Sequence, residues 1–83
     1  MRVIKNEEGL EYSWQDKFPA STRCSCGGQG KIAFVAIEDG EENDGYVCDF
    51  RPEDTDLWPH DAIAVAVYIC KKCMNTISKM NQA

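Results

Sequence analysis

The sequence lacks any long hydrophobic run. Met1 is followed by RVIKNEEGLEYSW, which contains neither the apolar segment nor the small-residue cleavage site of a secretory signal, and no other stretch is apolar enough to span a membrane. We therefore expect a cytoplasmic protein that does not enter membranes. In that reducing compartment, cysteines more often bind metal or carry out redox chemistry than form permanent disulfides.

Catalytic groups are also scarce. The chain contains one histidine, His60, and shows neither a nucleophile elbow nor a phosphate-binding glycine loop ahead of a helix. No second histidine is present to build a catalytic zinc centre with an open coordination position. We therefore expect that the protein is not an enzyme.

Positive charge is in short supply, because nine lysines and arginines are outnumbered by fourteen acidic residues and the formal net charge is −5. Residues 38–61 hold ten acids and one base, whereas the rest of the chain holds four acids and eight bases. Nonspecific nucleic-acid binding comes mainly from neutralising phosphates, so this balance disfavours DNA or RNA as a partner. A nucleic-acid-binding role stays open only through the basic residues near the cysteines.

Cysteine, in contrast, is plentiful, with five in 83 residues. A chain of this length buries only roughly 60 to 65% of the surface that its unfolded form exposes, so its core alone is marginally stable. Disulfides or a structural metal commonly support such small folds. An odd cysteine count in a reducing compartment favours the metal.

Four of the cysteines form two short pairs, Cys24-Ser-Cys26 and Cys70-Lys-Lys-Cys73. Tetrahedral zinc takes four thiolates at about 2.3 Å, usually supplied by two such turns that the fold brings together. The first pair is one residue shorter than usual, but Gly27 and Gly28 follow it and let the backbone turn with its amides toward the sulfurs. We therefore predict that these four cysteines bind one metal ion. A redox or disulfide role and plain buried thiols are the alternatives.

Basic residues flank both pairs. Nearby cations favour thiolate over thiol and offset the negative charge of a four-thiolate zinc centre. The residues concerned are Arg23, Lys31, Lys71 and Lys72.

Together these residues resemble a known fold. The C-x-C-G-G turn, an interval with strand signals, and the later Y-x-C-x-x-C are similar to a zinc ribbon. In that rubredoxin-like arrangement, two cysteine turns at one end of a small antiparallel sheet hold one zinc. The resemblance spans Arg23 to Cys73 and implies a fold and one structural Zn²⁺ ion. It implies no particular activity, because zinc ribbons serve many functions.

Two related patterns provide alternatives. Residues 26–30 also resemble the C-x-G-x-G half-repeat of DnaJ-type chaperone zinc domains, although the second cysteine pair carries no such glycines. The other alternative is a rubredoxin-like iron electron carrier, in which glycine normally follows both cysteine turns. Here Met74 and Asn75 follow the second turn. Zinc is therefore expected first and iron second.

Three segments predict β-strands, namely residues 31–37, 45–50 and 62–69. The expected fold class is a small, mostly-β, metal-bound domain with a three-stranded antiparallel sheet of the zinc-ribbon type. In the third segment bulky residues alternate with alanines, so both faces are apolar and this strand is expected to be central. Its alanine face must be covered either by Tyr12, Trp14 and Phe18 or by the tail after Cys73.

The flanking segments complete one predicted domain over residues 1–83, whose ribbon core is residues 23–73. Residues 1–22 are expected to form an extension or hairpin, with strand signals at RVIK and LEYSW around a turn at NEEG. In the tail, residues 74–83, apolar residues recur every third position, which favours a short helix on the sheet. These apolar residues are Met74, Ile77 and Met80.

Two further residues are candidate substitute ligands. Cys48 alternates with Tyr46 and Phe50 and is expected to be a buried thiol or, instead, a metal ligand if the short first pair cannot place both sulfurs. His60 is expected to lie in a solvated loop, with metal ligation as its alternative.

A partner-binding surface is predicted in one of two places. Leu57 and Trp58 are candidate anchors within the acidic stretch, whereas Lys71 and Lys72 belong to a basic end beside the second cysteine pair. We expect a small structural-zinc protein that acts as an interaction module for a protein partner.

Overall fold

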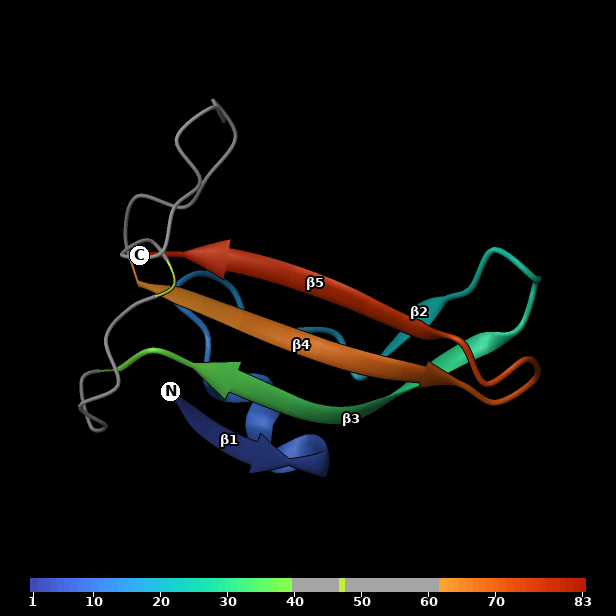
Figure 1. Ribbon diagram of the computed structural model, residues 1–83, viewed down its shortest axis with the longest axis horizontal. Coiled ribbons are helices and arrows are strands. Elements are labelled where there is room, and N and C mark those ends of the chain that lie inside the picture. The colour runs from blue at the N-terminus through green and yellow to red at the C-terminus, as the bar shows by residue number, and fades with distance from the viewer. Residues whose placement is uncertain (40–46, 48–61) are drawn as a thin grey trace.

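A computed structural model describes residues 1–39, residue 47 and residues 62–83. Within these residues the chain forms a single antiparallel sheet in which β1, β3, β4 and β5 lie in that order and β2 also pairs with β3 (Figure 1). The elements are β1 (Arg2–Lys5), the 3-10 helix η1 (Asn6–Glu11), β2 (Ser21–Arg23), β3 (Gln29–Ile37), β4 (Ile63–Cys70) and β5 (Thr76–Gln82). A small, mostly-β fold with an antiparallel sheet is therefore confirmed. No helix in the described part of the chain is long and apolar enough to cross a membrane.

The prediction of three strands is wrong, because both flanking segments add strands to the sheet. β3 and β4 cover the predicted strands at 31–37 and 62–69, and β4 lies between β3 and β5, so its central position is confirmed. The predicted strand at 45–50 lies outside the described residues, apart from residue 47.

In the N-terminal segment the predicted strand at RVIK is confirmed as β1, whereas the alternative in which it forms a hairpin with LEYSW is wrong. β1 pairs with residues 34–37 of β3, and residues 6–11 form η1 instead of a turn and a second strand. The reason is tertiary packing, because Leu10 of η1 is buried in the core of the sheet. Gly9 permits this close approach, since a Cβ there would lie 2.8 Å from the Ile4 carbonyl oxygen and 3.0 Å from the Val35 Cβ.

The tail forms a strand, so the predicted C-terminal helix is wrong. β5 pairs along its whole length with β4, from Thr76 opposite Ile69 to Gln82 opposite Ile63. A peptide this short gains little from helical propensity alone, and the open edge of β4 offers it a ladder of backbone hydrogen bonds. Ile77 packs against the core from β5, whereas Met80 points to the opposite face and is exposed.

The core lies on the alanine face of β4. Ala64, Ala66 and Tyr68 are fully buried there, and Leu10 of η1 and Phe18 cover them. The N-terminal segment therefore covers the alanine face, which settles the choice that sequence analysis left open. Tyr12 packs at the margin of the core, and Trp14 is exposed. The bulky face is the less buried one among the described residues, because Val65 and Val67 are only half-buried.

Glu38 ends β3 with a buried carboxylate. Its two oxygens accept hydrogen bonds from the backbone amides of Ile63, at 2.9 Å, and Val47, at 2.6 Å. In the sequence this residue is the first of the acidic stretch 38–61, and in the structure it joins the end of β3 to the start of β4. A buried carboxylate tolerates such a position only because its oxygens are hydrogen-bonded.

Candidate metal centre

The two cysteine pairs lie at the same end of the sheet. The first pair is in the turn between β2 and β3, and the second begins at the last residue of β4 and continues into the turn before β5 (Figure 1). Because β3 and β4 are antiparallel and Gly30 lies opposite Cys70, the start of β3 meets the end of β4. Antiparallel pairing thus brings together cysteines that are far apart in the sequence.

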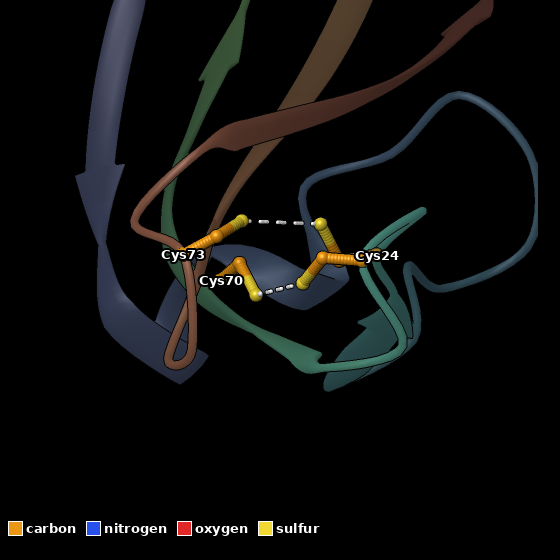
Figure 2. A group of neighbouring side chains, drawn as sticks. Cys24, Cys70 and Cys73 are labelled. Atoms are coloured by element: carbon orange, nitrogen blue, oxygen red, sulfur yellow. Dashed lines mark hydrogen bonds between the residues drawn. The ribbon is translucent and has the colours of Figure 1, made fainter.

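The four sulfur atoms form a cluster of the size that a metal ion requires. All four Sγ atoms lie within 4.8 Å of one another, and Figure 2 shows Cys24, Cys70 and Cys73 pointing toward a common centre. The shortest separations are 3.5 Å between Cys26 and Cys70 and 3.6 Å between Cys24 and Cys73. Four sulfurs at about 2.3 Å from a central zinc have edges of about 3.8 Å. A disulfide needs about 2.05 Å, so these residues are free thiols placed to hold a metal.

A tight turn explains how the short first pair places both of its sulfurs. The Cys24 amide donates to the Gly28 carbonyl at 2.9 Å, and the Gly27 amide donates to the Cys24 carbonyl at 3.0 Å. Gly27 has a φ of 89°, which L side chains disfavour, and the Gly28 amide donates to the Cys26 sulfur at 3.4 Å. The two glycines therefore aim the backbone at the sulfurs, as the sequence indicated.

The second pair has a similar turn. The Met74 amide donates to the Cys70 carbonyl at 3.0 Å, and the Lys72 amide donates to the Cys70 sulfur at 3.4 Å. The Lys71 amide donates to the Gln29 carbonyl at 3.1 Å, which ties this turn to the start of β3. Backbone hydrogen bonds therefore shape both turns and join the second one to the start of β3.

Burial divides the cluster evenly. Cys24 and Cys70 are buried, whereas Cys26 and Cys73 are exposed, so each pair contributes one sulfur of each kind. An ion at this centre would be anchored to the core on one side and would lie close to the molecular surface on the other.

Two of the four thiols have pKa values shifted in opposite directions. Hydrogen bonds from the Cys73 and Lys72 amides lower the pKa of Cys70 to about 6. The Gly28 amide lowers the pKa of Cys26, but hydrogen bonding to the Cys73 and Cys70 sulfurs outweighs it and raises that pKa to about 12. These hydrogen bonds favour the thiolate form of Cys70 and the protonated form of Cys26, and a bound cation would displace the proton of Cys26.

Exposed basic side chains surround the centre, as the sequence predicted. No carboxylate of the described residues lies within salt-bridge distance of any of them. These residues are Arg23, Lys31, Lys71 and Lys72. Within the described residues no carboxylate neutralises their charge, so it can offset the negative charge of a four-thiolate centre or meet a partner.

The other predicted site residues cannot be placed. Cys48 and His60, the candidate substitute ligands, and Leu57 and Trp58, the candidate anchors, lie outside the described residues. One residue that sequence reasoning passed over is Met74, which has a left-handed φ of 65°. The sequence signal for this conformation was the position of Met74 directly after a cysteine pair, which is equivalent to the position of Gly27.

We expect Gly28→Ala to destabilise the metal-loaded protein by about 2 kcal/mol and to weaken metal binding. A Cβ at this position would lie 2.7 Å from the Lys72 Cβ and 2.8 Å from the Cys70 sulfur, so the two turns must separate. Gly27→Ala is the matched comparison, because a Cβ there has no neighbour within 4 Å and strains only its own backbone. Competition with a chelator measures the difference, and equal metal affinity in the Gly28→Ala variant and the parent would contradict this packing.

No protein-family model, curated protein or solved structure matches this chain.

Proposed function

We propose that Cys24, Cys26, Cys70 and Cys73 hold one structural zinc ion and that the protein is a zinc-ribbon-like interaction module. The observation that carries the proposal is the placement of four sulfurs within 4.8 Å of one another. A tetrahedral set of four thiolates suits zinc or iron. Zinc has no redox chemistry, so it suits a site whose role is structural.

The proposed ion would act as a clasp between distant parts of the chain. It would join the turn before β3 to the turn after β4, whose cysteines are separated by more than forty positions in the sequence. Structural zinc sites contribute apparent binding free energies of about 10 to 16 kcal/mol, which exceeds the stability that so small a core supplies. The fold would therefore depend on the loaded site.

A non-catalytic role follows from the same ligand set. Four cysteines fill the coordination shell of zinc and leave no position for water or a substrate. Free thiols of this kind persist in a reducing compartment, which supports the proposed cytoplasmic location. With zinc bound, the centre has no catalytic position, so the role we propose for the protein is binding to another macromolecule.

Iron is the second candidate, and a specific observation favours it. Each turn donates a backbone amide to a sulfur, from Gly28 to Cys26 and from Lys72 to Cys70. Hydrogen bonds to sulfur tune the potential of iron–thiolate electron carriers. Protein from iron-supplemented cells would then be red, whereas a zinc protein is colourless.

Native mass spectrometry with elemental analysis tests the proposal. We expect one zinc per chain in the purified protein and none after treatment with a strong chelator. One iron per chain would replace the proposal with the electron carrier. A chain without metal, lighter by two protons for each thiol pair, would make the cysteines redox groups.

A further inference from the structure

Two residues other than glycine have left-handed backbone conformations among the described residues, and both line one groove. They are Asn6, with a φ of 59°, and Met74, with a φ of 65°. The groove has a volume of about 290 Å³ and lies beside the cysteine cluster, where η1, β3, the end of β4 and the second cysteine turn meet. Its lining includes Asn6, Lys31, Ala33, Ile69, Lys71 and Met74.

The two cysteine turns share a backbone conformation at one position, but different residues occupy that position. The residue after each pair has a positive φ, and it is Gly27 in the first turn and Met74 in the second. Asparagine tolerates this conformation, whereas an apolar L residue is disfavoured in it because its Cβ crowds the following carbonyl. Met74 therefore occupies a position where glycine would be more stable.

Packing does not explain the methionine. The Met74 side chain is 72% exposed and takes no part in the core. Ile69, which also lines the groove, is 38% exposed. Two large apolar side chains thus face solvent in one groove, and methionine adapts readily to the shape of a bound partner. Strained backbone positions cluster at binding sites, where the gain in function offsets their energetic cost.

Charge identifies the kind of partner. Lys31 lies opposite Ile69 in the sheet register, and Lys71 lies in the second cysteine turn. Both lysines are exposed, line the groove, and have no carboxylate partner among the described residues. The groove therefore combines an apolar floor with two cations that no carboxylate of the described residues neutralises.

We propose that this groove binds an acidic segment of a partner protein. An apolar side chain of that segment packs against Met74 and Ile69, and flanking carboxylates pair with Lys31 and Lys71. Nucleic acid fits less well, because none of the described residues that line the groove is an aromatic residue able to stack on a base, and the whole chain carries a net charge of −5. The inference rests on the proposed function, since the loaded second turn holds Met74 in its strained position.

The test uses the full chain, metal-loaded and labelled with ¹⁵N, in NMR titrations. The probe is a synthetic peptide of alternating glutamate and glycine with one central leucine, compared with the same peptide carrying serine in place of leucine. Oligothymidylate serves as the nucleic-acid probe. We expect the leucine peptide to shift the amide signals of residues 31, 69, 71 and 74 and to bind about tenfold more tightly than the serine peptide.

Variants separate binding from folding. We expect Met74→Gly to raise the Tm by about 3 to 6 °C, because glycine relieves the strain, and yet to weaken peptide binding about tenfold. Lys31→Glu is also expected to weaken binding about tenfold. Lys79→Glu makes the same charge change on β5, outside the groove, and should alter affinity by less than about twofold.

Several results would overturn the groove assignment. These are a Met74→Gly variant that binds like the parent, equal losses in Lys31→Glu and Lys79→Glu, tighter binding of oligothymidylate than of the peptide, or no peptide binding up to about 1 mM. Native mass spectrometry of each variant reports its metal content. A parent that carries no metal contradicts the proposed function itself, whereas a loaded parent that ignores the peptide contradicts only the groove.

Discussion

Cys70→Ser is expected to abolish metal binding and to lower the Tm by more than about 20 °C. The Cys70 side chain is fully buried, and its sulfur is 3.5 Å from that of Cys26 and accepts a hydrogen bond from the Lys72 amide. Serine cannot supply a thiolate, so the shell loses its most buried ligand. Each 1 kcal/mol shifts the Tm of a domain this size by about 4 to 8 °C, and the metal is expected to contribute far more than that.

Thermal melting followed by circular dichroism measures this effect. Treating the parent with a strong chelator should reproduce the loss, because it removes the same clasp without changing the chain. Ser25→Ala is the matched control, since Ser25 is exposed between Cys24 and Cys26 and contributes no ligand. Equal melting temperatures and metal contents in Cys70→Ser and the parent would remove the basis of the proposed clasp.

Tyr68→Ala is expected to lower the free energy of unfolding by about 3 to 5 kcal/mol. Among the described residues Tyr68 is the largest fully buried side chain, and it packs in the core with Ala66 and Phe18. Its hydroxyl donates to the Pro19 carbonyl at 2.7 Å, and burial raises the pKa of that hydroxyl, so it stays protonated as the donor. Alanine would leave a cavity and an unpaired carbonyl.

Urea unfolding of the metal-loaded protein distinguishes the two contributions. Tyr68→Phe keeps the ring and loses only the hydrogen bond, so we expect a loss of about 1 kcal/mol. Metal content should stay at one ion per chain in both variants, because Tyr68 carries no ligand. A loss below about 1 kcal/mol in Tyr68→Ala would show that the covered face of β4 is assigned wrongly.

Sequence analysis located β1 at RVIK, and it located β3 and β4, which have the strongest intrinsic signal. β3 and β4 are long apolar runs rich in β-branched residues, which predict strands without knowledge of their neighbours. β5 and η1 carry weak local signals. They take their conformations from the sheet, β5 by pairing with β4 and η1 by burying Leu10. Tertiary contacts of this kind cannot be read from one segment alone.

The cysteine cluster was predictable because its ligands are chemically distinctive and occur in short turns. Spacing alone grouped Cys24 and Cys26 with Cys70 and Cys73, and the structure brings all four sulfurs together. The left-handed backbone at Met74 was not predicted, since side-chain identity there argues against that conformation. Glu38 was also misjudged, because a carboxylate at the edge of an acidic stretch gives no sign that backbone amides will bury it.

X-ray absorption spectroscopy of the purified protein at the zinc edge tests the central claim most directly, because it reports the atoms around the ion. We expect four sulfur neighbours at about 2.3 Å and no oxygen or nitrogen ligand. That result would establish that both cysteine turns share one ion, as the 4.8 Å sulfur cluster indicates. A shell with fewer than four sulfurs, or purified protein without a bound metal, would contradict the account.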